Sequence, residues 1–140
     1  MFILPTKWNF IAKSFEALSS ILDRMYNDIY TEVLDIRTII WIAPTFQNSW
    51  VNYGSGYNNA AYCKDAMGFV HLRGLVKDGT DNSAIFTLPV GYRPAYQELF
   101  CVISNGVVGQ VDVRTDGVVT ASNPSDPEWI TLDGITFYAG

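Results

Sequence analysis

The sequence is poor in charged residues, and in basic residues above all. Charged residues make up 16% of the 140, against ~25% in an average soluble domain. The chain has nine Lys and Arg but fourteen Asp and Glu, so its net charge is −5. No basic run occurs anywhere in the chain. Because binding to nucleic acid requires Lys and Arg to neutralise phosphates, the sequence argues against a nucleic-acid partner.

Cysteine and long apolar runs are also scarce. Cys63 and Cys101 are too few for a disulfide framework, and we expect both to be small buried side chains of a chain that folds in a reducing compartment. No apolar run approaches the ~18–20 residues that a membrane span needs. The run Phe2–Leu4 is too short for the core of a signal peptide. We therefore expect no membrane insertion.

Motifs that build catalytic sites are missing as well. His71 is the one histidine, and a lone histidine cannot hold zinc without further ligands. Cys63 and His71 could in principle pair as nucleophile and base, but no motif around them supports this, so a structural histidine is the favoured interpretation. No phosphate-binding loop precedes a helix. The sequence predicts no enzyme, no metal site and no cofactor.

The N-terminal segment does carry a strong pattern. Between Lys7 and Thr38 there is no Gly or Pro, and the apolar residues recur at alternating spacings of three and four, which predicts a long helix with a heptad stripe. The stripe residues are Trp8, Ile11, Phe15, Leu18, Leu22, Met25 and Ile29. We expect residues 1–43 to be a helical oligomerisation segment and residues 44–140 to be a β domain.

Two arrangements can cover such a stripe. The helix can form a coiled coil with copies of itself, or it can pack as an amphipathic helix on the chain's own sheet. Seven heptad positions favour self-association, and the large side chains of Trp8 and Phe15 fit the wider seam of a trimer better than that of a dimer. The favoured expectation is a homotrimer.

The remainder of the chain alternates short apolar runs with turn residues and has no helical period, which predicts an antiparallel β-sandwich or jelly roll of about eight strands. Asn105-Gly106 and Asp116-Gly117 are the clearest turns. Four of the expected strands are Thr45–Tyr53, Ala61–Asp65, Phe69–Lys77 and Trp129–Tyr138. Gly74 marks a bulge or a close approach by another backbone. Asp133-Gly134 could be a hairpin turn, although a bulge within one strand is the preferred interpretation.

One loop mixes aromatic residues with amides and glycines. Tyr and Trp offer flat apolar faces for sugar rings, and Asn offers hydrogen bonds. The candidate ligand-binding residues are Trp50, Tyr53, Tyr57 and Asn58. The alternative interpretation is a core tryptophan followed by an ordinary loop.

Residues Ile85–Pro94, IFTLPVGYRP, resemble the IFTLP-x-GYRP segment of many phage tail, tail-fibre and baseplate proteins. Further pieces of that pattern occur in the same order over residues 46–140. They are Trp50–Tyr53, Gly68–Gly74, Val111–Val113, Thr115–Gly117 and Trp129–Ile135. The N-terminal helix is not part of the pattern.

The resemblance implies a homotrimeric virion component with a β-sandwich similar to domains of lactococcal-phage-type receptor-binding proteins. It implies assembly in the bacterial cytoplasm, contact with other tail proteins and action at the tail tip in host adsorption. It carries over no saccharide-binding residues, because the binding loops of that family vary. The alternative function is a stand-alone carbohydrate-binding module that recognises glycans on a cell surface.

Overall fold

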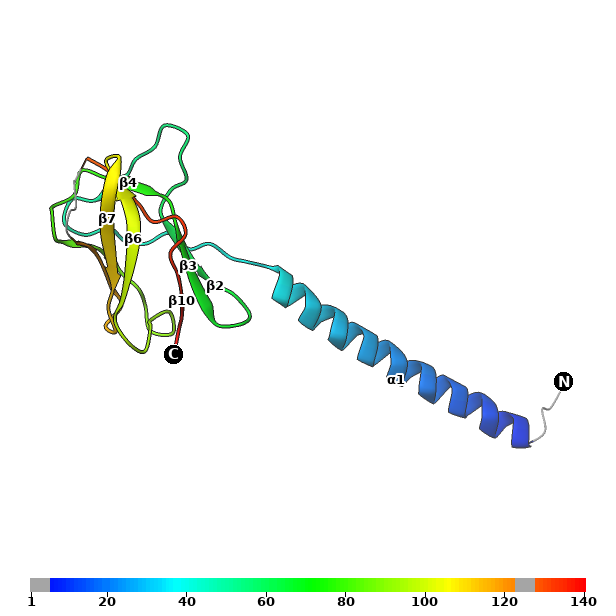
Figure 1. The fold of residues 1–140 in the computed structure, drawn as a ribbon. Helices are drawn as coiled ribbons and strands as arrows, with labels where there is room; N and C mark the ends of the chain where they lie inside the picture. Colours follow the sequence, from blue (N-terminus) through cyan, green and yellow to red (C-terminus); the bar gives the residue numbers. More distant parts are fainter. Residues whose placement is uncertain (1–5, 123–127) are drawn as a thin grey trace. The chain divides into compact units, whose positions relative to one another are not determined.

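The computed structural model of the 140-residue chain describes residues 6–122 and 128–140, and within the helix it describes the side chains of residues 8–34. The chain divides into two compact units, Met1–Thr38 and Ile39–Gly140. The described part of the first unit is one long helix, and the second, here called the β unit, is built from antiparallel strands (Figure 1). The expected fold class, a mainly antiparallel β domain preceded by an N-terminal helix, is confirmed.

Helix α1 runs over Thr6–Arg37, within one residue of each predicted end. Its apolar stripe is exposed in the single chain: Trp8 is 58% exposed and Phe15 67%, and only Ile11 among the seven stripe residues is partly buried. Among the described helical residues, no stretch combines the length and the apolar character that a membrane crossing requires. Since most stability of a helix comes from packing its apolar face, α1 by itself lacks its main source of stability.

The larger sheet of the β unit has seven strands in the order β1-β4-β9-β6-β7-β8-β5. They are β1 (Val51–Asn52), β4 (Leu75–Lys77), β5 (Ala84–Thr87), β6 (Glu98–Ser104), β7 (Val107–Val113), β8 (Val118–Ser122) and β9 (Ile130–Thr131). Both predicted turns are present. Asn105 and Gly106 have φ of 45° and 81°, as a tight hairpin requires. Asp116-Gly117 joins β7 to β8.

The smaller sheet has three strands in the order β10-β3-β2. They are β2 (Ala61–Lys64), β3 (Phe69–Arg73) and β10 (Thr136–Tyr138). Figure 1 shows these three strands beside one another, with β6 and β7 in the other sheet. Strand β2 confirms the run predicted over Ala61–Asp65, one residue shorter.

Two runs predicted as single strands are each divided between the sheets. The chain leaves the smaller sheet at Gly74, where φ is +108° and a Cβ atom would lie 2.5 Å from the backbone nitrogen of Ala60. The close backbone approach expected at Gly74 is therefore confirmed, but the single strand Phe69–Lys77 is wrong. The single strand Trp129–Tyr138 is also wrong, because the chain crosses from β9 to β10 through a turn at Asp133-Gly134. These divisions raise the eight expected strands to ten described ones.

The two crossings lie side by side and are hydrogen-bonded to each other. The backbone N–H of Leu132 donates to the carbonyl oxygen of Gly74 at 2.8 Å, and that of Leu72 donates to the carbonyl oxygen of Ile135 at 2.9 Å. The N–H of Gly74 donates to the side chain of Asp133 at 2.8 Å. These bonds satisfy backbone groups that leave the sheet ladders where the chain changes sheet.

The expected strand Thr45–Tyr53 is reduced to Val51–Asn52. Asn48 and Ser49 have φ of 50° and 67°, which interrupts the extended backbone. Phe46 retains one isolated bridge, to Phe86 of β5.

The core of the β unit lies between its two sheets. It gathers side chains from both sheets and from the loops, with Trp50 and Phe86 the largest that are fully buried. The indole N–H of Trp50 donates to the hydroxyl oxygen of Ser83 at 3.1 Å, so its polar atom is satisfied inside the protein. Of the two cysteines, Cys63 is buried as expected. Cys101 is exposed, because it lies on the outward face of β6 between Leu99 and Ile103, so the expectation that it is buried is wrong.

Candidate ligand-binding cleft

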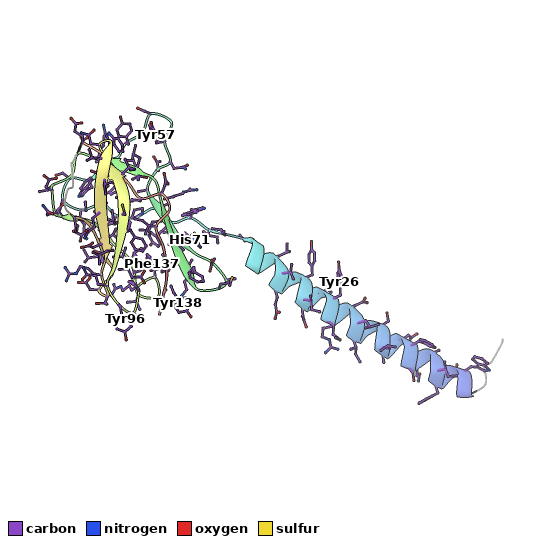
Figure 2. All side chains as sticks on the ribbon, in the orientation of Figure 1. Tyr26, Tyr57, His71, Tyr96, Phe137 and Tyr138 are labelled. Carbon is purple, nitrogen blue, oxygen red and sulfur yellow. The ribbon has the colours of Figure 1, made fainter. Side chains whose placement is uncertain are left out.

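The loop between β1 and β2 turns back on itself and brings two predicted site residues together. Gly54, Ser55 and Gly56 all have positive φ, and the backbone N–H of Tyr57 donates to the carbonyl oxygen of Gly54 at 3.1 Å. The rings of Tyr53 and Tyr57 meet edge to face, with centroids 5.3 Å apart and an interplanar angle of 88°. Figure 2 shows Tyr57 at one end of the β unit and Tyr96 and Tyr138 toward the other.

The segment around β9 supplies the opposite side of the cleft. Ile130 and Leu132 are fully buried, so the alternate residues Trp129, Thr131 and Asp133 face outward. These three residues were not among the predicted site residues. The alternation of Trp, Thr and Asp with two aliphatic residues was the signal that could have found them.

Strand order explains why the two sides meet. Strand β9 lies between β4 and β6, and Leu75 of β4 is paired directly with Thr131. The backbone N–H of Tyr53 donates to the carbonyl oxygen of Leu75 at 2.9 Å, which ties the loop to the same edge. The result is a cleft of about 280 Å³. It is lined by Tyr53, Tyr57, Leu75, Ile103, Trp129, Thr131 and Asp133.

The carboxylate of Asp133 is held in position at the edge of the cleft. One oxygen accepts the N–H of Gly74 at 2.8 Å, and the other accepts the hydroxyl of Thr131 at 3.3 Å. The backbone N–H of Asp133 donates in turn to the Thr131 hydroxyl oxygen at 3.1 Å. The two contacts to the carboxylate and the backbone contact to Thr131 limit its rotation, while part of its accepting capacity stays unused.

The other two predicted ligand-binding residues lie elsewhere. Trp50 is 1% exposed and belongs to the core, so its ring offers no face to a ligand. Asn58 is exposed, and its backbone carbonyl oxygen accepts the N–H of Leu75 at 3.1 Å. Asn58 is not among the residues that line the cleft.

His71 lies on the outward face of β3, within a separate polar cluster. Its Nε2 lies 3.0 Å from a carboxylate oxygen of Asp65, and its Nδ1 lies 3.0 Å from the hydroxyl oxygen of Thr136. An ionised carboxylate only accepts hydrogen bonds, so Nε2–H donates to Asp65, and in the neutral ring Nδ1 accepts from Thr136. The hydrogen bond from His71 lowers the pKa of Asp65, and the backbone N–H groups of Phe69 and Met67 lower it further.

This cluster does not support a cysteine nucleophile. Cys63 is paired with His71 across β2 and β3, but its side chain is fully buried. Burial raises the pKa of the Cys63 thiol, which disfavours the thiolate that nucleophilic chemistry needs. Among residues 6–122 and 128–140, no three His, Cys, Asp or Glu side chains are placed to hold a metal ion.

Comparisons with known proteins give one likeness in structure. No family model matches the chain, and no curated protein matches it in sequence. Its fold is that of a phage receptor-binding protein, a long N-terminal helix followed by antiparallel β-sheets. The chain is similar to the receptor binding protein (gp15) of Listeria phage PSA, with a TM-score of 0.77 and 17% identity over 100% of this chain and 89% of that chain. The expected resemblance to tail proteins is confirmed in structure.

Proposed function

We propose that this chain is a phage tail protein that binds the host surface during adsorption and acts as a homotrimer joined through α1. The observation that carries the proposal is the structural likeness over the whole chain to a phage receptor binding protein. The Ile85–Pro94 segment, with its resemblance to tail and baseplate proteins, supports it independently. On this proposal the protein is part of the virion at the tail tip and contacts other tail proteins.

The exposed stripe of α1 supports the trimer. Leu18, Leu22 and Met25 are each more than half exposed in the single chain. Burying such side chains between copies yields roughly 1 kcal/mol for each half-exposed residue. Three copies also multiply a weak surface contact, because the second and third sites bind at high effective concentration.

Light scattering and cell binding test the proposal together. The full chain should have three times the 15.6 kDa mass of one chain over a wide concentration range. The fluorescently labelled trimer should bind some strains of a Gram-positive panel that includes Listeria, and unlabelled trimer should compete. A protein that stays monomeric and labels no strain of the panel would refute the proposal.

The runner-up function is a stand-alone carbohydrate-binding module. The observation that favours it is the cleft beside Tyr53 and Tyr57, which requires no second copy. This function predicts a monomer that binds glycans with single-site affinity. Neither function includes catalysis, so purified cell wall incubated with the chain should release no soluble fragments, with or without His71→Ala.

A further inference from the structure

We propose that the cleft between the Tyr53–Tyr57 loop and β9 binds a single neutral hexopyranose unit of a surface glycan. This inference deepens the proposed receptor-binding function and rests on it for its biological role. The cleft volume of about 280 Å³ lies just below the ~300–1,000 Å³ typical of ligand pockets. That size suits one sugar ring rather than a longer chain.

The apolar part of the cleft matches the apolar face of a pyranose. Tyr53 and Tyr57 present two rings nearly at right angles, and Trp129 adds an indole from the other side. A sugar ring carries its C–H groups on its faces and its hydroxyls around its edge, so an aromatic corner covers the faces and leaves the edge free. Leu75 and Ile103 complete the apolar lining.

The polar part of the cleft matches the edge of the ring. A carboxylate has about four lone-pair sites, and two contacts, from Gly74 and Thr131, occupy two of those on Asp133. The remaining two can accept a pair of neighbouring sugar hydroxyls. Such bonds are charge-assisted and therefore stronger than neutral ones. The carboxylate is also pre-oriented, so less freedom is lost when a ligand binds.

Charge selects a neutral sugar over an anionic one. Asp133 brings a negative charge to the lining and repels a phosphate or a carboxylate. Lys77 is the nearby cation, 5.6 Å from the centroid of the Tyr53 ring, but its ammonium group is already 3.4 Å from the carboxylate of Asp78. The local charge therefore offers no net attraction for an anion.

The test uses the full chain and saturation-transfer NMR with a named set of probes. These are the methyl glycosides of glucose, galactose, rhamnose, N-acetylglucosamine and N-acetylgalactosamine, with glucose 6-phosphate as the anionic probe. At least one neutral glycoside should bind in the millimolar range, and glucose 6-phosphate should bind more weakly than methyl glucoside. Binding of none of the five neutral glycosides, or preferred binding of the phosphate, would overturn the inference.

Variants locate the binding. Tyr57→Ala removes one ring, and Asp133→Asn removes the charge while its amide oxygen can still accept the N–H of Gly74. Each replacement should lower the affinity for the glycoside that binds wild type about tenfold or more. Tyr57→Phe should retain most of that affinity. Tyr96→Ala is the matched control, because Tyr96 is 83% exposed and does not line the cleft. Equal affinity of wild type, Tyr57→Ala and Asp133→Asn would show that the sugar binds elsewhere and would refute the cleft as its binding site.

Cell labelling separates this inference from the proposed function. If the trimer labels cells and the Tyr57→Ala and Asp133→Asn variants label them equally well, the receptor-binding function is supported and the cleft is refuted. If glycoside binding depends on the cleft but the chain is monomeric and labels no cells, the cleft is supported and the tail function is refuted.

Discussion

The helix and the β unit both place large apolar side chains on one face, but they differ in whether the single chain covers that face. Trp50 in the β unit is 1% exposed, whereas Trp8 in α1 is 58% exposed. The β unit covers the inner face of each sheet with the other sheet. The helix has one stripe and needs another surface to cover it. The β unit is thus a fold that one chain can stabilise, whereas the apolar stripe of α1 stays exposed in one chain.

This difference also separates the roles that we propose for the two parts. On the proposed function, the apolar heptad stripe of α1 holds the copies together and takes no part in recognising the host. The outward face of the β unit instead mixes aromatic, hydroxyl and carboxylate groups around a cleft. The proposal therefore assigns assembly and recognition to different residues, and it predicts that each can be disrupted without the other.

The largest expected effect comes from charging the helix stripe. The double replacement of Leu18 and Leu22 by Asp places unpaired carboxylates in the proposed seam, at a cost of several kcal/mol for each buried charge. Light scattering should show the mass falling from three chains to one. The amide NMR signals of the buried strands in the β unit should be unchanged, because none of the described residues in its core belongs to α1.

The control for this variant replaces Ser20 and Asn27 by Asp. Both residues are exposed and lie off the stripe by heptad spacing, so the charge added is equal but stays in water. The control should remain trimeric. A stripe variant that keeps the trimer mass would contradict the proposed role of the stripe in assembly. A stripe variant that loses the β-unit signal would show that the β unit is not stable without the trimer.

The second largest expected effect is a difference in stability between alanine replacements at two glycines of the β unit. In Gly74→Ala the new Cβ atom would lie 2.5 Å from the backbone nitrogen of Ala60, at a φ of +108°. In Gly56→Ala the φ is also positive, +85°, but no atom lies within 4 Å of the new Cβ. The first variant combines backbone strain with a clash against backbone that cannot move aside, and the second has the strain alone.

Chemical denaturation at fixed protein concentration measures the difference. Gly74→Ala should lower the free energy of unfolding by roughly 3 kcal/mol or more, and Gly56→Ala by about 1 kcal/mol. Equal losses would mean that positive φ alone matters and that the corner between the sheets is not tightly packed. The pair therefore tests whether the crossing that positions Asp133 is rigid.

Local patterns in the sequence predicted those elements of the fold that depend on residues close together in the chain. The heptad spacing gave α1 to within one residue, and Asn105-Gly106 and Asp116-Gly117 gave the hairpins of β6, β7 and β8. These features follow from backbone preferences and side-chain period, which are properties of short segments.

The cleft depends on contacts between distant residues, and only Tyr53 and Tyr57 among its lining residues were predicted. Tyr53 and Tyr57 stood out because aromatic residues and glycines are adjacent in one loop. Thr131 and Asp133 join them because β9 pairs with β4, a pairing of residues more than fifty positions apart that leaves no local signature. Buried residues keep their spacing of two through the first crossing, from Val70 and Leu72 to Val76, so the alternation does not reveal that the chain changes sheet at Gly74. At the second crossing the spacing widens to three, between Leu132 and Ile135.

The smallest effect concerns the polar cluster around His71 and has a defined pH dependence. Asp65 accepts hydrogen bonds from His71 and from two backbone N–H groups, and its pKa is lowered. A carboxyl group with a lowered folded pKa stabilises the protein above its unfolded pKa, near 3.9. That stability is lost as the pH falls through the folded pKa, because protonation then removes the favoured ionised form.

Asp65→Asn removes this contribution. The variant should melt below the wild type at pH 7, and the difference should shrink as the pH falls below about 4. The matched control is Asp78→Asn, because Asp78 makes an exposed ion pair with Lys77 and such pairs contribute little. Thermal melts followed by the amide NMR signals of the buried strands report the β unit, which contains Asp65. A constant difference between wild type and Asp65→Asn from pH 7 to pH 3 would show that the carboxylate acts through shape alone, and that its charge adds nothing to the stability of the β unit.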